Sequence, residues 1–187
     1  MVIVLSLVTI SFFGCASASK KAPAVGELGE PMWFKNPPPD PNYLYGVATA
    51  TSRDLQMSID KASTEATAQI GSKIELRVQA LRKKFDEETG VEADSQLLQM
   101  FTKATKLVVS TSLSGVSVKE QEYKKNGEIY RAFVLMEYPI GQINKDLLSQ
   151  IKSKEEIYTR YRASQTFKEL EEEVKKYEDF KREQGYR

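Results

Sequence analysis

The middle of the chain carries two long stripes of apolar residues that recur every three or four positions. Such spacing predicts amphipathic helices, here one over 54–88 and a second over 93–111. Ser52 or Asp54 can cap the first helix, Thr89-Gly90 breaks it, and Ser114-Gly115 ends the second. The first stripe is Leu55, Ile59, Ala62, Ala66, Ile70, Ile74, Val78, Leu81 and Phe85, and the second is Leu97, Phe101, Ala104, Val108 and Thr111.

Three other stretches alternate with a period of two, which predicts β-strands. The first covers 43–51, where small residues on one face leave room for a helix to lie close. The other two, 116–123 and 129–138, flank Asn126-Gly127, which we expect to supply the positive backbone dihedrals of a tight hairpin turn. The last strand is apolar on both faces, with Ala132, Val134 and Met136 on one and Phe133 and Leu135 on the other. It should therefore lie more centrally than its charged partner.

The segment 141–186 is strongly charged and predicted to be helical, with Ala163, Phe167, Leu170, Val174 and Tyr177 at 4-3-4-3 spacing. Either it is a coiled-coil or docking helix, or it is one amphipathic helix that packs on its own domain or projects from it. Together these elements predict an α+β fold. A small antiparallel sheet of about three strands, in β-α-α-β-β order, packs on long helices, and a charged C-terminal helix follows.

The first fourteen residues form an uncharged, largely apolar run that leads to Gly14-Cys15. The run is too short to span a bilayer, which needs roughly 20 apolar residues, but it suits the apolar region of a signal peptide. A small residue before a cysteine resembles the lipobox of bacterial lipoproteins. There the thiol receives a diacylglyceryl group, the chain is cut before the cysteine, and the new amine is acylated, for example with palmitate. We therefore expect residues 1–14 to be a lipoprotein signal peptide, cleaved between Gly14 and Cys15, with Cys15 lipidated.

The alternative is an ordinary signal peptide or an uncleaved anchor in which Cys15 is incidental. Phe12 stands where lipoboxes usually carry an aliphatic residue, and no basic residue precedes the apolar run. We therefore expect the true start to lie upstream of Met1. Ala16 rather than Asp follows the cysteine, which by resemblance to lipoprotein sorting signals favours the outer membrane.

Two segments connect this anchor to the predicted domain. Residues 15–30 are expected to form the lipid anchor and a flexible tether. Residues 31–42 form a proline-rich lead-in in which Trp33 and Phe34 stand out. These two aromatic residues are either a ligand platform, a membrane-touching edge or, as we favour, a plug at one end of the core. The domain is expected to span 31–140, with the helical tail at 141–187.

Composition narrows the possible chemistry. The 187 residues include 27 Lys and Arg against 26 Asp and Glu, no histidine, and Cys15 as the single cysteine. This excludes His-based triads and cysteine-based metal cages, and the near-zero net charge does not favour nucleic acid. Asp60 with Glu65 is better explained as a solvated helix face than as an acid pair, and Tyr45 as a core or sheet tyrosine than as a catalytic one. We expect no enzyme activity, no cofactor and no metal site.

The order of these segments resembles the Lpp-twenty family of small bacterial outer-membrane lipoproteins. The residues that carry the resemblance are Trp33 with the prolines after it, Tyr45-Gly46-Val47-Ala48, the alanines Ala62, Ala66 and Ala68, and Tyr130-Arg131-Ala132-Phe133-Val134. The resemblance covers roughly 31–140 and implies an α+β core in which a curved antiparallel sheet holds a long helix. Some members of the family resemble flagellar accessory lipoproteins, and others are surface antigens.

The function expected from these features is a lipid-anchored envelope lipoprotein with a non-enzymatic structural or assembly role, in a narrower version a flagellar accessory. Its partners would be the membrane, through the lipid on Cys15, and a second copy or another envelope protein. The alternative is a binding module for an envelope lipid or another ligand, which would need an apolar pocket between sheet and helices.

Overall fold

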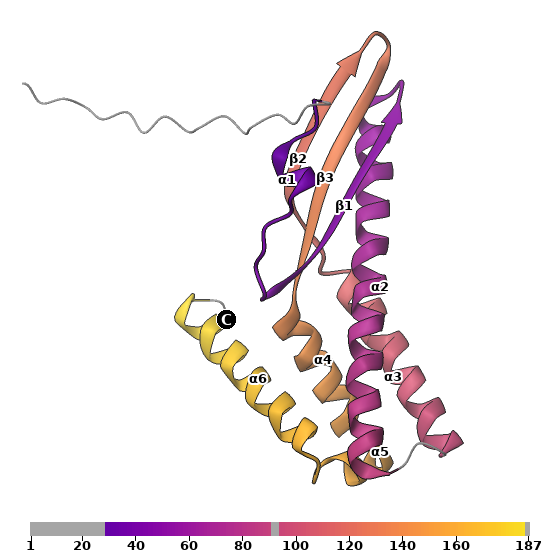
Figure 1. The fold of residues 1–187 in the computed structure, drawn as a ribbon, viewed down its shortest axis with the longest axis vertical. Coiled ribbons are helices and arrows are strands. Elements are labelled where there is room, and N and C mark those ends of the chain that lie inside the picture. The colour runs from indigo at the N-terminus through magenta and orange to yellow at the C-terminus, as the bar shows by residue number, and fades with distance from the viewer. Residues whose placement is uncertain (1–28, 91–93, 186–187) are drawn as a thin grey trace, which may run out of the picture.

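The computed structural model describes residues 29–90 and 94–185. The predicted signal peptide, Gly14, Cys15 and nearly all of the tether therefore lie outside the described residues. The elements are α1 (Met32–Lys35), β1 (Tyr43–Ser52), α2 (Leu55–Thr89), α3 (Ser95–Leu113), β2 (Ser117–Asn126), β3 (Ile129–Pro139), α4 (Ile140–Lys152), α5 (Glu155–Tyr161) and α6 (Gln165–Glu183) (Figure 1). The predicted α+β class is confirmed.

The sheet has the strand order β1-β3-β2, and both pairings are antiparallel. The apolar β3 is central, as predicted from apolar residues on both of its faces. The predicted hairpin is present, but its turn is centred one residue later than expected. Gly127 alone has a positive φ, of 59°, and the loop is Gly127-Glu128 between the paired residues Asn126 and Ile129. Glycine at the first central position is the pattern of a type II′ turn.

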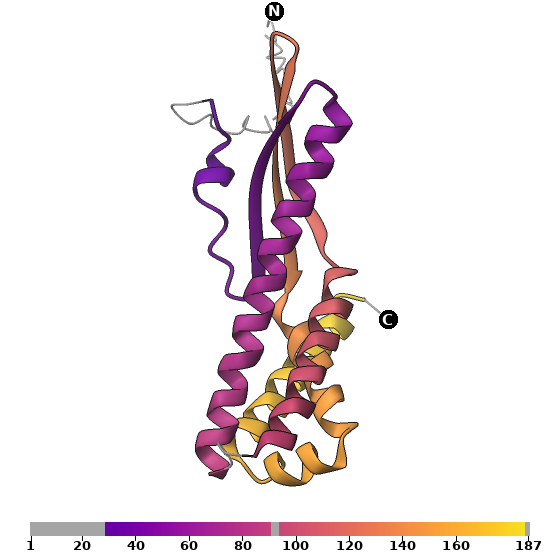
Figure 2. The same ribbon diagram turned by 90° about the vertical axis from the view of Figure 1, so that its right-hand side faces the viewer.

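The first half of α2 lies against the face of the sheet that carries the small residues (Figure 2). Ala62, Ala66 and Ile70 are fully buried there. A Cβ on Gly46 would stand 2.0 Å from the backbone oxygen of Ala66, so only glycine permits this approach. The predicted flat strand face and the alanine-rich helix stripe therefore meet each other.

The helix also covers the outer edge of β1. The side-chain oxygen of Gln69 accepts a hydrogen bond from the backbone N–H of Val47 at 3.1 Å. The ammonium group of Lys73 donates to the backbone oxygen of Tyr45 at 2.6 Å. These two bonds occupy backbone groups that would otherwise be free at the edge of the sheet.

The second half of α2 leaves the sheet and packs with α3, α4, α5 and α6 at the opposite end of the molecule (Figures 1 and 2). Phe85 stacks on Tyr161 with ring centroids 4.6 Å apart, and Phe101 meets Tyr161 edge-on. The buried apolar residues of this end include Phe85, Leu97, Phe101, Ala104, Val108, Ile143, Leu147, Leu148, Ile151, Ile157, Tyr161, Phe167, Leu170 and Val174. All of these except Ala104 join the residues beneath the sheet in one hydrophobic cluster.

The C-terminal segment differs from the single helix predicted over 141–186. It forms three helices, because the chain turns at Ser153 and again after Tyr161, where Ser164 caps α6 by accepting from the N–H of Phe167. Phe167, Leu170 and Val174 are buried as the stripe predicted, whereas Ala163 is exposed between two helices. Of the two interpretations of the tail, packing on its own domain describes α6, which contacts α4 and α2.

Two smaller expectations are also corrected. In α3 the buried residue near the end is Ser112, not Thr111, because the burial stripe continues by four residues from Val108. The proline-rich lead-in contains one helical turn, α1, and lies over the sheet face opposite α2 instead of plugging an end of the core (Figure 2). Phe34 packs edge-on against Phe133, with ring centroids 5.2 Å apart.

Candidate functional site

The predicted anchor residues, Gly14 and Cys15, lie outside the described residues. What the structure does show is where the described chain enters the fold. Gly29 has a φ of 75°, and a Cβ there would lie 3.0 Å from the ammonium nitrogen of Lys124 on β2. Pro31 is buried, and the indole N–H of Trp33 donates to Glu122 at 3.1 Å. The lead-in is therefore held on the outer face of the sheet beside β2.

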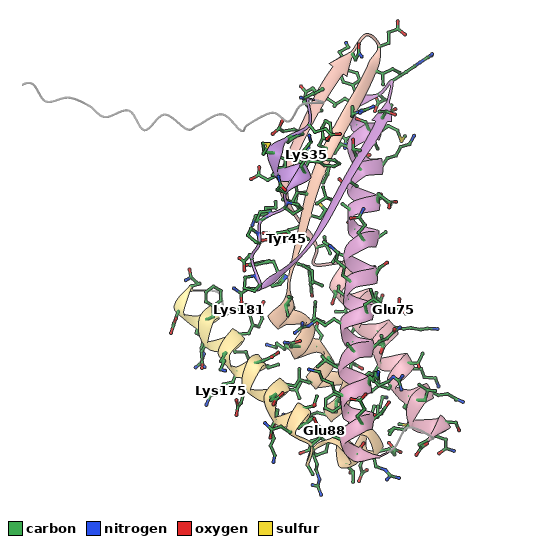
Figure 3. All side chains as sticks on the ribbon, viewed as in Figure 1. Lys35, Tyr45, Glu75, Glu88, Lys175 and Lys181 are labelled. Atoms are coloured by element: carbon green, nitrogen blue, oxygen red, sulfur yellow. The ribbon has the colours of Figure 1, made fainter. Side chains whose placement is uncertain are left out.

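A cluster of aromatic and charged side chains lies further along the same face. The ammonium group of Lys119 donates to Glu137 at 2.7 Å and stands 5.6 and 5.3 Å from the ring centroids of Tyr43 and Tyr45. The hydrogen bond to Glu137 raises the pKa of Lys119, and burial raises the pKa of Tyr43. Tyr45 is only 8% exposed and is labelled in Figure 3. Its place in the sheet matches the interpretation of this residue as a core or sheet tyrosine.

A groove opens where the lead-in, β1, α4 and α6 meet. Its volume is about 460 Å³, and its apolar lining comes mainly from Tyr43, Ile140, Tyr177 and Phe180. Phe180 is 52% exposed. Gly141 forms part of the wall, and a Cβ there would come within 2.3 Å of the ring of Tyr177. This glycine lets α6 approach the start of α4.

The floor of the groove is polar. Arg77 on α2 donates to the side-chain oxygen of Asn144 at 3.5 Å and lies 3.8 Å from a carboxylate oxygen of Glu173. Asn144 in turn donates to Glu173 at 2.6 Å. Burial raises the pKa of Tyr177. The groove thus offers aromatic and aliphatic walls together with the guanidinium group of Arg77 and the carboxylate of Glu173.

A separate polar network fixes the far end of the helices. The hydroxyl of Tyr161 donates to Asp86 at 2.7 Å, and Arg82 donates to the other carboxylate oxygen at 2.6 Å. Burial and the neighbouring carboxylate raise the pKa of Tyr161. Because every charge in this network is paired within a packed core, we assign it a structural role. The sequence analysis did not single out these residues. The one sequence feature that could have indicated this network is Asp86, an acidic residue next to the apolar stripe of α2.

The carboxylate of Glu88 caps α6 from outside that helix. It accepts from the backbone N–H of Thr166 at 3.1 Å and also from the hydroxyl of Thr166. These hydrogen bonds lower the pKa of Glu88. Glu88 lies near the end of α2 that faces α6 (Figure 3).

The remaining candidate residues from the sequence lie on the surface of the molecule. Asp60 and Glu65 are exposed on α2, where Asp60 accepts from Gln56 at 2.7 Å, so the interpretation of a solvated helix face is confirmed. Within 29–90 and 94–185, acidic side chains do not gather into a group that could hold a metal ion. No helix in those ranges is long and apolar enough to cross a membrane.

The fold is thus a three-stranded antiparallel sheet held between the proline-rich lead-in and a long helix, with candidate site residues on its surface and in the groove between α4 and α6. This defines a small α+β domain, as the resemblance seen in the sequence implied. The model of the LPP20 lipoprotein family matches residues 31–136, so the chain belongs to that family. Comparisons with curated proteins and with solved structures find no match. The matched region ends within β3, and α4 to α6 lie beyond it.

Proposed function

We propose that this protein is a lipid-anchored envelope lipoprotein with a non-enzymatic structural or assembly role. The observation that carries the proposal is its membership of a lipoprotein family together with one cysteine, Cys15, placed after an apolar run and a small residue. Lipid at that cysteine, followed by a tether, would hold the described domain at a membrane surface. Two or three acyl chains suffice for stable anchoring.

The structural part of the proposal is supported by what the fold presents. Among the described residues, four ion pairs join neighbouring elements, for example Lys145 with Glu178 at 2.9 Å and Lys152 with Glu171 at 2.7 Å. The long helix and the sheet give an extended body whose two ends differ, one formed by the hairpin and the other by helices (Figure 1). Such a body suits a spacer or an assembly unit.

The anchor is tested by replacing Cys15 with Ser in the full chain and fractionating cells. The variant is expected to lose the lipid and to leave the membrane fraction or remain unprocessed, while Ser17→Ala, two residues away, behaves as the wild type. If the Cys15→Ser variant stays in the membrane and migrates as the wild type does, the lipoprotein proposal is wrong.

The outer membrane is the location we propose, because Ala16 follows the cysteine. Separation of inner and outer membranes on a density gradient tests this. The wild-type protein should band with the outer membrane, and Ala16→Asp should move it towards the inner membrane. Wild-type protein in the inner membrane would contradict the proposed location and leave the anchor itself unaffected.

A narrower version places the protein beside a flagellum as an accessory lipoprotein. Its support is the family resemblance alone. Co-purification with flagellar basal bodies is the expected result, with an unrelated outer-membrane lipoprotein as the control. An equal distribution of the two proteins over basal-body and bulk membrane fractions would reject this version and leave the general envelope role.

The second candidate function is binding of an envelope lipid or another amphiphilic ligand. The groove between α4 and α6 favours it, since its size is within the range of ligand sites and it combines aromatic walls with Arg77. Native mass spectrometry of the membrane-extracted protein is expected to show a non-covalent adduct that is lost in Tyr177→Ala and kept in Lys175→Ala, an exposed control on α6. Protein without an adduct would reject this function.

A further inference from the structure

The two edges of the sheet differ in whether another element covers them. The edge of β1 is covered by α2 through Gln69 and Lys73, as described above. The edge formed by β2 has no such cover among the described residues, whose backbone hydrogen bonds outside the helices and strands do not involve 117–126. An uncovered strand of ten residues is a site where another strand can add.

The turn determines which backbone groups of β2 point outward. In a hairpin with a two-residue loop, the residues that flank the loop form a hydrogen-bonded pair. Asn126 and Ile129 flank it here, so Asn126, Lys124 and Glu122 direct their backbone groups towards β3. The alternation of the ladder then leaves the N–H and C=O groups of Gln121, Tyr123 and Lys125 on the open edge. The register shift between Val118 and Glu120 ends the regular segment, which therefore spans 120–126.

Charge along this segment decides which partner strand fits. If a second copy of β2 adds antiparallel, around a two-fold axis normal to the sheet, only registers that place an outward residue opposite another outward residue are allowed. Centring the axis on Tyr123 places Glu122 of each copy opposite Lys124 of the other, and Gln121 opposite Lys125. Each neighbouring allowed register opposes like charges at least once. An axis at Glu122 pairs Glu122 with itself, although it also pairs Glu120 with Lys124. An axis at Gln121 pairs Glu120 with Glu122, and axes at Lys124 and Lys125 pair these lysines with themselves. Of these registers, only the one centred on Tyr123 opposes no like charges.

The side chains of β2 agree with the register centred on Tyr123. Tyr123 is 54% exposed and touches Tyr130 at a centroid distance of 6.3 Å. In this register Tyr123 faces the Tyr123 of the second copy, and the two rings would bury each other across the two-fold axis. The lead-in does not stand in the way. Its contact with β2 through Trp33 and Glu122 lies on the sheet face opposite α2, and its described residues make no backbone hydrogen bond to 117–126.

We propose that the β2 edge is a self-complementary docking surface for a second copy of this chain. The two sheets would join into one six-stranded antiparallel sheet through residues 120–126. Three outward residues on each strand would supply about six backbone hydrogen bonds across the axis. This inference rests on the proposed assembly role and adds to it the contact and the register.

Charge exchange on the full-length, detergent-extracted protein tests the proposal, with sedimentation analysis as the readout. Wild type is expected to dimerise reversibly. Glu122→Lys places two lysine pairs across the axis and Lys124→Glu places two glutamate pairs there, so each should weaken dimerisation by about tenfold or more. The double variant restores opposite charges and should dimerise as the wild type does. Glu75→Lys, an exposed charge reversal on α2, is the matched control and should leave dimerisation unchanged (Figure 3).

The comparison between single and double variants separates pairing from misfolding. Glu122→Lys also removes the hydrogen bond between Trp33 and Glu122. The double variant removes the same hydrogen bond, and Lys124→Glu keeps it, so loss of this bond cannot explain the expected pattern of dimerisation. Tyr123→Cys gives a second readout. Oxidation should link two copies directly, whereas Leu76→Cys, exposed on α2, should not link. A wild-type protein that stays monomeric, or a double variant as weak as the single ones, would overturn the proposal.

Failure of this inference can be told apart from failure of the proposed function. A lipidated, membrane-bound protein without Tyr123→Cys cross-links would refute the β2 contact and leave the anchored role in place. A protein that dimerises with this charge pattern but carries no lipid would support the contact and refute the anchor.

Discussion

Gly46 and Gly141 show how single residues control the packing of the helices. Each lies where a neighbouring element approaches so closely that a side-chain carbon has no space, with contacts of 2.0 and 2.3 Å for a hypothetical Cβ. At Gly46 the neighbour is the backbone oxygen of Ala66, which can move only if the whole of α2 moves. At Gly141 the neighbours are the ring of Tyr177 and also its Cβ, at 2.8 Å, which side-chain rotation does not move. A side chain at either glycine would therefore require the neighbouring helix to shift.

Gly46→Ala is expected to lower the free energy of unfolding by about 2 kcal/mol or more, because the new methyl group forces α2 away from β1. Chemical denaturation monitored by circular dichroism measures the change. Gly71→Ala is the matched control within α2, since its Cβ would meet only the side chain of Leu113 at 3.3 Å, and alanine favours the helix. Equal stability of the Gly46→Ala variant and the wild type would contradict the close packing of helix and strand.

Glu88 shows how one carboxylate joins two helices. Its hydrogen bonds from Thr166 lower its pKa below the ordinary value of 4.5. Because the folded pKa is depressed, the carboxylate stabilises the fold above the unfolded pKa, and this contribution is lost as the pH falls through the folded pKa. The contribution is therefore present at pH 7 and absent in strong acid.

Glu88→Gln is expected to unfold at lower denaturant concentration than the wild type at pH 7, because the neutral amide is a weaker cap for α6. The difference should shrink as the pH falls below 4.5 and disappear in strong acid. Denaturation curves at a series of pH values measure it. Glu87→Gln, the exposed neighbour, controls for the loss of charge. A difference that does not change with pH would exclude the capping role.

At the scale of elements, local patterns predicted α2, α3 and the three strands, because each has its apolar period along one continuous stretch. The hairpin was predicted from Asn126-Gly127, and Gly127 adopts the positive φ because glycine has no Cβ to oppose it. The breaks in the tail were missed because Ser153 and Ser164 are common helix caps as well as common helix-surface residues, and no Gly or Pro accompanies them. The turn of α1 was missed because prolines surround it and its position depends on Phe133, a hundred residues away.

The lead-in is expected to depend on Phe34 for its place on the sheet. Phe34→Ala removes the ring that packs on Phe133 and should cost about 1–3 kcal/mol of stability, since Phe34 is only half-buried. Hydrogen exchange should become faster in 31–42 while α2 remains protected. Lys35→Ala, exposed on the same turn, should change neither property. Unchanged exchange in Phe34→Ala would show that the lead-in is held by other contacts.

At the scale of the whole molecule, sequence patterns could not predict the groove. Its walls come from segments as distant as Tyr43 and Phe180, and its floor from Arg77 on α2. Each of these residues has an ordinary local explanation as a strand tyrosine, a helix-surface residue or part of an amphipathic stripe. Only the packing of α6 across α4 brings them together. The prediction that the tail packs on its own domain indicated the contact but not the groove.

The position at which the tether joins the folded domain is also a property of the whole molecule. The described chain begins beside β2, at the half of the sheet near the hairpin, while α4 to α6 gather at the other end (Figures 1 and 2). In the proposed arrangement the tether joins the sheet half of the molecule to the membrane. The central claim of this account is that the tether starts at a lipidated Cys15.

Intact mass spectrometry of the protein extracted from membranes tests that claim most directly. The account predicts one mature species that begins at Cys15 and carries the mass of a diacylglyceryl group, with or without a further acyl chain on its amine. Cys15→Ser should yield no such species. A mature protein that begins at another residue and carries no lipid would contradict the anchor and make ligand binding in the groove the leading function.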